Sequence, residues 1–352
     1  MPASGPDEVD YFTGSCILSD ASRGPVDTLE GVLTRTKHIL LGAGGAITNP
    51  LVGELLSQGE SVKLVSRSGR ALPRAEPVRA DLTKAADVLD AVEQSSVVYL
   101  IAGLPYSTAV WREEWPKVMQ NTIAACSAKG AKLLFFDNVY MYGKVRGPMK
   151  EDSPVAPCSR KGEIRARIAD LLLSAAGRGH LQALIARSAD FYGPYARGSS
   201  VPMLLVIGRL AEGKNAQWLI NPHARHSLTY TLDCGKALSL LAKSENAYGQ
   251  VWHLPTASPP VTGEEFIGIA DRKFGRTSGM PPRYSVLGRG SMRIAGIFNP
   301  LVRETYEMLY QNDDEYIFDS TKFCSHFGFT PTPYEEGIGS AVDYARLKTK
   351  EG

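Results

Sequence analysis

The 352-residue sequence has few of the features that mark secreted, membrane-spanning or nucleic-acid-binding proteins. Its five cysteines are scattered without a Cys-x-x-Cys pair, which argues against both a disulfide framework and a zinc site. No uninterrupted apolar run approaches the roughly 20 residues that a membrane span requires. The formal net charge is only +2, and like charges form no long run, so neither a nucleic-acid partner nor a membrane surface is indicated.

The remaining composition is that of an ordinary globular protein, with 43% hydrophobic and 22% charged residues. The first residues include Asp7, Glu8 and Asp10, where a secretory signal would carry positive charge, so we expect a reducing, cytoplasmic setting. Residues 1–35 are rich in Gly, Ser, Pro and Asp and are interpreted as an N-terminal extension. His223 and His226 lie three apart but have no accompanying carboxylate cluster, so no metal site is predicted.

The most informative stretch is an apolar strand at 37–41 that runs into a glycine cluster and then a helix. This order is typical of proteins that bind a dinucleotide pyrophosphate, because the loop amides and the positive end of the helix dipole face the anion. Thr48 stands where the usual pattern has its third glycine. The predicted pyrophosphate-binding residues are Gly42, Gly44, Gly45, Ala46 and Ile47.

A second strand at 61–67 follows the helix and completes a βαβ unit. An acidic residue at its end would favour NAD, whereas this chain has Arg67, Ser68 and Arg70, which suit a 2′-phosphate. The sequence therefore predicts NADP(H) as cofactor. The alternative is that both arginines are solvated loop cations.

Further strands alternate with helices, which predicts an α/β fold with a doubly wound parallel sheet of the Rossmann type. The Rossmann domain is assigned to residues 36–192. Residues 193–352 are assigned mainly to a smaller, interleaved C-terminal substrate-binding lobe that returns some segments to the first domain. Ligands of such sheets lie beyond the carboxyl ends of the strands. Four strand-end residues are added to the cofactor site on this ground: Asp81, Leu82, Ala102 and Gly103.

Motifs along the chain resemble those of the extended short-chain dehydrogenases/reductases, which include the NAD-dependent epimerases and dehydratases. The motifs are the glycine loop, the strand Val98-Tyr99-Leu100-Ile101-Ala102-Gly103, the pair Tyr142-Gly143 and the segment Arg187-Ser188-Ala189-Asp190-Phe191-Tyr192-Gly193-Pro194. The resemblance extends over about residues 37 to 345. It implies hydride transfer between nicotinamide C4 and a carbonyl or secondary alcohol of a small molecule. It also implies a homodimer formed through helices near residues 111–128 and 160–176.

The sequence departs from this family at its catalytic positions. The family's reacting oxygen is held by Ser or Thr, and that position falls on Asn138, whose amide can donate a hydrogen bond but cannot relay a proton. The family's Tyr-x-x-x-Lys motif falls on Lys161 and Arg165 in the best register.

This departure leaves three accounts open. Lys161 acts as general acid or base, its pKa lowered by repulsion from Arg160 and Arg165, while Arg165 holds the ribose. Alternatively, Tyr140 or Tyr192 transfers the proton. In the third account the protein binds NADPH without turnover, as a scaffold or redox sensor.

Substrate contacts are expected from the C-terminal lobe and from the strand ends. The family's substrate loop corresponds to the region around Arg225 and His226, which suit an anionic or polyhydroxyl ligand. Tyr192 completes the predicted substrate-binding set, although packing near the strand ends is the alternative role for this ring.

Overall fold

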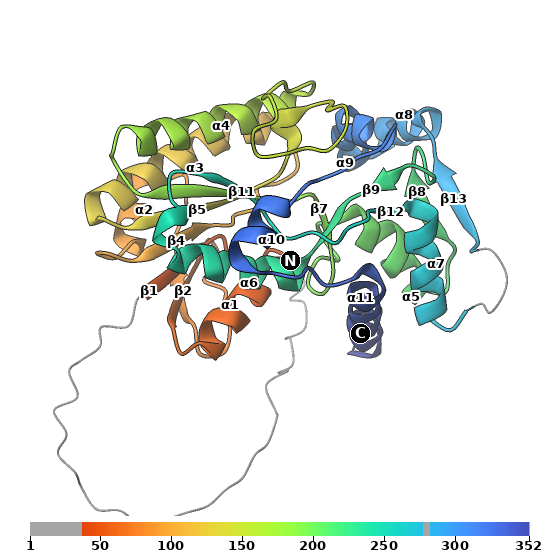
Figure 1. Cartoon of the computed structure of the whole chain (residues 1–352), viewed down its shortest axis with the longest axis horizontal. Helices are drawn as coiled ribbons and strands as arrows, with labels where there is room; N and C mark the ends of the chain where they lie inside the picture. Colours follow the sequence, from red (N-terminus) through yellow and green to blue (C-terminus); the bar gives the residue numbers. More distant parts are fainter. Residues whose placement is uncertain (1–36, 277–281, 352) are drawn as a thin grey trace, which may run out of the picture. The chain divides into compact units, whose positions relative to one another are not determined.

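The computed structural model describes residues 37–276 and 282–351 (Figure 1). The predicted N-terminal extension, residues 1–35, lies outside the described residues. The described residues belong to one compact unit. No helix in the described ranges is both long enough and apolar enough to cross a membrane.

A seven-stranded sheet forms the centre of the molecule, and all its neighbouring strands are parallel. Its order is β11-β6-β5-β4-β1-β2-β3. Strands β2 and β3 are added on one side of β1, and β4 and the later strands on the other side, so the order of strand addition reverses between β1 and β4. That reversal opens a crevice at the carboxyl ends of these two strands, where such sheets bind ligands. The strands are β1 (Lys37–Leu41), β2 (Ser61–Ser66), β3 (Glu76–Arg79), β4 (Val97–Leu100), β5 (Lys132–Asp137), β6 (Ala183–Arg187) and β11 (Val251–His253).

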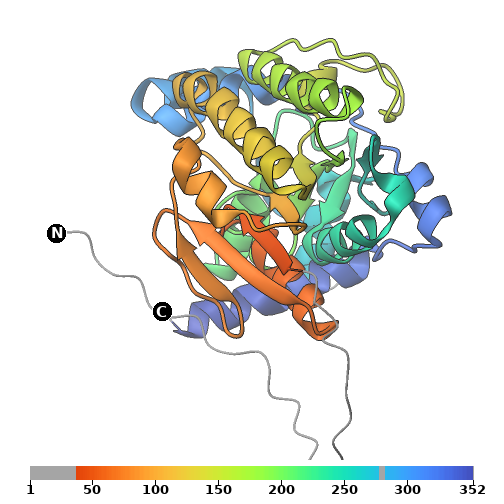
Figure 2. The ribbon, with the colours of Figure 1, turned by 90° about the vertical axis from the view of Figure 1, so that its left-hand side faces the viewer.

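Helices cover both faces of this sheet (Figures 1 and 2). Ile39 and Leu41 of β1 point into one core cluster and Leu40 into the other, so both faces of the strand are apolar and fully buried. The helices on one face are α1 (Thr48–Ser57) and α6 (Thr231–Lys243), and those on the other are α2 (Ala85–Ala91), α3 (Thr108–Lys129) and α4 (Arg160–Gly177).

The C-terminal part contains three two-stranded sheets beside the central one. They are β7 (Asp190–Tyr192) with β10 (Leu228–Tyr230), β9 (Arg225–His226) with β12 (Val261–Thr262), and β8 (Ala216–Leu219) with β13 (Tyr284–Leu287). The helices here are the π-helix η2 (Met203–Gly208), α5 (Arg209–Ala211), α7 (Gly263–Lys273), α8 (Arg289–Phe298), α9 (Pro300–Thr305), α10 (Thr321–Phe327) and α11 (Tyr334–Glu351). Short 3-10 helices are η1 (Tyr140–Tyr142), η3 (Glu245–Ala247) and η4 (Tyr306–Asn312).

The smaller lobe is interleaved with the Rossmann core. Strand β11 returns to the central sheet beside β6, and α6 packs against α1. A Cβ atom on Gly235 of α6 would lie 2.6 Å from the backbone of Pro50, so only glycine allows the two helices to approach this closely. The predicted doubly wound fold with an interleaved lobe is confirmed, and the exact boundary at residue 193 stays a prediction.

Candidate active site

The glycine loop follows β1 and lies directly against the end of β4. Gly42 has φ of +113°, and a Cβ atom built on it would lie 2.3 Å from Cα of Ala102. No rotation of a side chain relieves a clash with backbone, so glycine is required here. The structure thus brings together two of the predicted cofactor residues, with Gly103 exposed next to them.

Thr48 ties this loop to the first turn of α1. Its Oγ1 accepts hydrogen bonds of 3.1 Å from the amides of both Gly44 and Gly45. The side chains of Ala46 and Ile47 are buried in the core beneath the loop. The threonine at the third-glycine position therefore orders the loop through its hydroxyl group.

Arg70 lies beside the glycine loop. A Cβ atom on Gly44 would come within 3.4 Å of Arg70 Nη1. The amide of Arg70 donates to Ser66 Oγ at 3.0 Å, and this hydroxyl lies 3.5 Å from that of Ser68, so the turn after β2 is held by its own serines. Guanidinium and loop amides together make a donor set that suits phosphate groups, and the residues present fit a dinucleotide.

The end of β3 is organised by Asp81. Its Oδ1 accepts hydrogen bonds from the amide and the hydroxyl of Thr83, at 3.0 and 2.8 Å. These bonds lower the pKa of the Asp81 carboxyl group, with a smaller contribution from the exposed Arg67 nearby. Leu82 is buried, and its carbonyl accepts from Asn121 Nδ2 at 3.0 Å. The adenine-binding role of Asp81 and Leu82 stays a prediction.

Asn138 follows β5 at the carboxyl end of the sheet. Its Oδ1 accepts from the amide of Tyr140 at 3.1 Å, which starts the turn η1. None of the described residues accepts a hydrogen bond from its Nδ2. The preceding Asp137 is fully buried and pairs with Arg165, whose Nε lies 2.7 Å from Oδ1, and Arg187 contributes a second guanidinium.

Lys161 is fully buried at the start of α4 and is held by four acceptors. Its Nζ lies 2.6 Å from Glu304 Oε2, 2.8 Å from Glu307 Oε1, 2.9 Å from Thr108 Oγ1 and 3.0 Å from the Glu304 carbonyl. The ammonium group also lies over the ring of Tyr106, 4.7 Å from its centroid. The two carboxylates come from α9 and η4 of the smaller lobe.

The predicted repulsion of Lys161 by Arg160 and Arg165 is wrong. The Arg165 guanidinium is engaged by Asp137 and lies among aromatic rings, including that of Trp115 at 4.6 Å. Two carboxylates, not two guanidinium groups, form the charged surroundings of Lys161. The backbone amide of Arg160 donates to Glu307 Oε2, at the N-terminus of α4 where negative charge is favoured.

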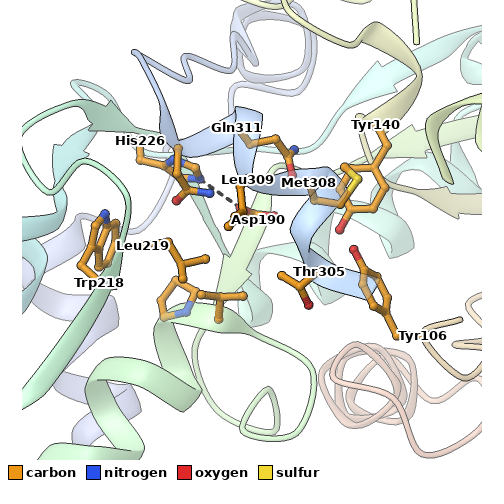
Figure 3. Close-up of a pocket in the computed structure, with 13 residues that line it drawn as sticks. Tyr106, Tyr140, Asp190, Trp218, Leu219, His226, Thr305, Met308, Leu309 and Gln311 are labelled. Carbon is orange, nitrogen blue, oxygen red and sulfur yellow. Dashed lines mark hydrogen bonds and ion pairs between the residues drawn. The ribbon is translucent and has the colours of Figure 1, made fainter. Parts of the chain in front are cut away.

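A cavity that is partly open to solvent lies between the sheet and the smaller lobe (Figure 3), and the empty space in it, including the solvent at its open mouth, is about 510 Å³. Most of its walls are apolar or aromatic, and its charged or titratable groups are few. The lining residues are Tyr106, Tyr140, Asp190, Val201, Pro202, Trp218, Leu219, His226, Thr305, Met308, Leu309, Gln311 and Asn312.

Asp190 and His226 pair with each other at one end of this cavity. His226 Nε2 lies 3.0 Å from Asp190 Oδ2, and its ring stacks on Tyr316 with centroids 4.5 Å apart. Gln311 in turn donates to the Tyr316 hydroxyl at 3.0 Å. Stacking and pairing fix the orientation of both side chains that face the cavity.

The hydroxyl groups of Tyr106 and Tyr140 point toward one another at another part of the cavity (Figure 3). Burial raises the pKa of the Tyr140 hydroxyl above its ordinary value, and the charge of Asp190 adds to this shift. The hydrogen bond between Tyr106 and Tyr140 and the positive charge of Arg165 lower the pKa of Tyr140, but by less than burial raises it. The net effect keeps Tyr140 protonated at neutral pH, so it can donate to an oxygen in the cavity.

Two predicted substrate-binding residues do not line the cavity. The side chain of Tyr192 is fully buried in the core and packs among the rings of Tyr230, Phe266 and Tyr334. Arg225 donates to the Pro260 carbonyl at 2.7 Å and is paired with a carboxylate of α7. These contacts give no support to a substrate-binding role for Tyr192 or Arg225, whereas His226 lines the cavity and its substrate-binding role stays a prediction.

Three groups of the site escaped the sequence interpretation. Asp190 lies within the segment Arg187–Pro194, which carries part of the family resemblance, and its position before Phe191-Tyr192-Gly193 is the available signal. Glu304 and Glu307 have no local signal, because they reach Lys161 from more than a hundred residues away.

No metal site emerges from the same region. The four cysteines among the described residues are free thiols, and no group of three metal-binding side chains is arranged for an ion within the described ranges.

A family model described as "NAD dependent epimerase/dehydratase family" matches residues 38–254. No curated protein matches the chain. Among solved structures, MoeE5 in complex with UDP-glucose and NAD is 22% identical, has a TM-score of 0.69, and the alignment covers 89% of this chain and 99% of MoeE5.

Two further solved structures share this architecture at lower identity. The UDP-glucuronic acid 4-epimerase from Bacillus cereus, in complex with NAD, is 17% identical with a TM-score of 0.69, over 89% of this chain and 99% of that one. DesIV, a dTDP-glucose 4,6-dehydratase from Streptomyces venezuelae with NAD and TYD bound, is 17% identical with a TM-score of 0.73, over 90% and 98%. At these identities the likeness shows the shared fold.

Proposed function

Because the chain belongs to the NAD-dependent epimerase/dehydratase family, we propose that it is an NADP(H)-dependent oxidoreductase or epimerase. It transfers hydride between nicotinamide C4 and a carbonyl or secondary alcohol of a small molecule. Family membership supports an enzyme of this class that uses a nicotinamide dinucleotide. We further propose that the cofactor is NADP(H), that Tyr140 is the proton donor and that the protein is a homodimer.

The position of Arg70 is the observation that carries the cofactor choice. Its guanidinium lies next to the glycine loop, and Arg67 stands exposed on the same turn. A 2′-phosphate adds about two negative charges to the adenosine ribose, and charge-assisted hydrogen bonds from arginine are among the strongest polar contacts. The end of β2 offers no carboxylate to accept from a free ribose hydroxyl, since Ser66, Arg67 and Ser68 occupy it.

Bound nicotinamide supplies or accepts hydride at C4. The reacting oxygen is held by Asn138, whose Nδ2 is available as a donor at the end of β5. Tyr140, which is protonated at neutral pH, donates its phenolic proton to the substrate oxygen when a carbonyl is reduced, and the resulting phenolate takes up a proton from solvent. Tyr106 contacts the Tyr140 hydroxyl and orients it toward the cavity.

Lys161 and Arg165 have a positioning role in this proposal. Lys161 joins the starts of α3 and α4 to α9 and η4, which carry Thr305, Met308 and Leu309 of the cavity wall. Arg165 neutralises Asp137 directly below Asn138. Neither side chain lines the cavity, and both are engaged by carboxylates.

The second candidate function is an NADPH-binding scaffold or redox sensor without turnover. The observation that favours it is the burial of Lys161 between two glutamates, which removes one candidate general acid or base from the reacting region. A substrate-dependent change in NADPH absorbance separates the two functions.

A homodimer is proposed by family resemblance alone, through the surfaces of α3 and α4 at residues 111–128 and 160–176. Size-exclusion chromatography with light scattering gives the mass directly. A monomeric mass at micromolar concentration would rule out this assembly without affecting the cofactor assignment.

Cofactor choice is tested by calorimetric titration with NADPH and NADH. We expect wild type to prefer NADPH, and Arg70→Ala to weaken NADPH binding by about tenfold or more while leaving NADH nearly unchanged, as the loss of a charged hydrogen bond predicts. Arg178→Ala, an exposed arginine at the end of α4, is the matched control. Equal affinities of wild type for both cofactors would refute the NADP(H) assignment.

Proton transfer is tested by NADPH oxidation against a panel of carbonyl compounds, comparing wild type with Tyr140→Phe and Asn138→Ala. The phenol is expected to contribute about 100-fold or more to kcat, within the range of general acid catalysis. Tyr195→Phe, at a tyrosine outside the cavity-lining set, is the control. If Tyr140→Phe turns over an established substrate at the wild-type rate, another group donates the proton.

A further inference from the structure

The cavity combines apolar walls with one carboxylate and lacks a guanidinium or ammonium group among its lining residues. Six aliphatic, thioether or aromatic side chains form most of the surface: Val201, Pro202, Trp218, Leu219, Met308 and Leu309. The polar groups that face it are hydroxyls, amides, Asp190 and His226. This composition determines which ligands pay only a small desolvation free energy when they move from water into the cavity.

We propose that the cavity selects an uncharged, largely apolar carbonyl compound or alcohol and rejects nucleotide diphosphates. The inference rests on the proposed function, because it names the substrate class of the same site. Its basis is the distribution of charge around the cavity rather than the shape of the fold.

Asp190 is the first part of the argument. A carboxylate accepts hydrogen bonds and cannot donate them, so it pairs with a substrate hydroxyl and repels a phosphate. Its hydrogen-bond partner in the cavity, His226, is held at 3.0 Å and is stacked on Tyr316, so the imidazole is already engaged by the carboxylate. A diphosphate placed here would meet a negative charge in partly desolvated surroundings.

The nearby cations are the second part, because each is already paired. Lys161 is fully buried behind Tyr106 and is neutralised by Glu304 and Glu307. The Arg165 guanidinium is bound to Asp137. None of these groups can compensate a ligand diphosphate without first breaking an existing ion pair.

Arg225 is the third cation near the site, and it is not among the residues that line the cavity. Its Nη1 donates to the Pro260 carbonyl at 2.7 Å and lies 3.7 Å from Glu265 Oε2. The sequence suggested that Arg225 would bind an anionic ligand. Arg225 is therefore engaged by a carbonyl and a carboxylate, and His226 is engaged by Asp190.

An uncharged ligand satisfies the groups that remain. Its carbonyl or alcohol oxygen accepts from Tyr140, a second hydroxyl donates to Asp190, and its hydrocarbon part covers Trp218 and Met308 (Figure 3). Each polar atom then has a partner, which is the condition for a low cost of desolvation.

The test compares two probes by isothermal titration calorimetry on the full chain, with and without NADP+. The probes are 2-tetralone, an uncharged bicyclic ketone, and UDP-glucose, which carries a diphosphate. We expect 2-tetralone to bind wild type. We expect UDP-glucose to bind Asp190→Asn at least about tenfold more tightly than wild type, because the substitution removes the repelling charge and keeps the shape.

Two additional variants make the comparison specific. Glu212→Gln removes a carboxylate that is paired with Lys214 and Arg197 outside the cavity, so it changes the net charge equally and should leave both affinities unchanged. Val201→Lys adds a cation at an exposed position of the cavity wall and should tighten UDP-glucose binding even if Asp190→Asn folds poorly.

The proposal is overturned if UDP-glucose binds wild type as tightly as it binds Asp190→Asn and Val201→Lys, or if 2-tetralone gives no binding. These readouts need no turnover and do not depend on the cofactor. Failure to bind NADP(H) or to transfer hydride therefore counts against the proposed function, whereas failure of the charge comparison counts against the substrate class alone.

Discussion

The Nζ atom of Lys161 lies 2.6 Å from Oε2 of Glu304, across 143 residues of sequence. The same carboxylate oxygen accepts from the amide and the hydroxyl of Thr108, at 2.9 and 2.7 Å. One carboxylate thus connects the starts of α3 and α4 to α9. Because α9 and η4 supply part of the cavity wall, this ion pair determines where the wall lies relative to the sheet.

Replacement of Lys161 by Met should destabilise the protein by about 3–5 kcal/mol, the usual cost of removing one partner of a buried ion pair. Glu304 and Glu307 would be left close together without a counter-charge. Denaturant-induced unfolding followed by tryptophan fluorescence measures the loss. Lys117→Met, at a solvent-exposed pair with Glu113, should change stability by less than about 1 kcal/mol.

The companion variant combines Lys161→Met with Glu304→Gln and Glu307→Gln. It should recover much of the lost stability, since no uncompensated charge remains. If the single and the triple variants are equally unstable, packing of the lysine stem rather than charge pairing explains the effect.

Stability should fall in acid through Glu304. Burial alone would raise the pKa of this carboxyl group, but hydrogen bonds from Lys161 and Thr108 outweigh it and lower the pKa to about 2 from 4.5. A depressed pKa means that the unfolded chain takes up the proton first. The contribution is therefore complete above about pH 4.5 and is lost as the pH falls toward 2.

The measurement is the difference in unfolding free energy between wild type and Glu304→Gln as a function of pH. We expect wild type to be the more stable at neutral pH and the difference to shrink steadily below about pH 4.5. A difference that stays constant down to about pH 3 would show that Glu304 does not carry the acid sensitivity.

A side chain at residue 42 would clash with backbone, whereas a side chain at residue 44 would contact only a flexible side chain. An alanine at Gly42 would place its Cβ 2.3 Å from Cα of Ala102, whereas at Gly44 the contact is the flexible end of Arg70, at 3.4 Å. Gly42→Ala should therefore cost more than about 4 kcal/mol or prevent folding, while Gly44→Ala should cost about 1–3 kcal/mol from its positive φ. Thermal unfolding of both variants distinguishes them, and equal losses would contradict the backbone clash.

The sequence predicted the parts of the site that depend on local order. The strand, the glycine loop and α1 are contiguous, and the alternation of strands with helices leaves few topologies. The sequence alone therefore places Gly42, Gly45 and Ala102 at one edge of the sheet. The end of β5 placed Asn138 and Tyr140 by the same argument.

The parts that failed depend on contacts between distant segments. The sequence predicts that Arg160 and Arg165 repel Lys161, because they are its neighbours along the chain. No sequence pattern links Glu304 and Glu307 to α4. Tyr192 and Arg225 were assigned by position in a motif, but their directions depend on packing by Tyr334 and on the carbonyl of Pro260. A strand places a residue at an edge, and the surrounding lobe decides where its side chain points.

The hydroxyl group of Thr48 should stabilise the glycine loop, and Thr48→Val tests this with little change in shape. The substitution leaves the amides of Gly44 and Gly45 without their shared acceptor, which should cost about 1–3 kcal/mol. Because these amides belong to the predicted phosphate site, we also expect weaker NADPH binding. Unfolding free energy and the NADPH dissociation constant are measured on the same preparation.

The matched control is Thr122→Val in α3. That hydroxyl is also fully buried, but it donates to the carbonyl of Val118 at 2.8 Å within the helix, so its removal leaves no donor without a partner. Thr122→Val should therefore cost less than Thr48→Val and leave NADPH affinity unchanged. If both variants lose equal stability and neither binds NADPH more weakly, the loop does not depend on the Thr48 hydroxyl group. Threonine would then have no specific role at the position of the third glycine.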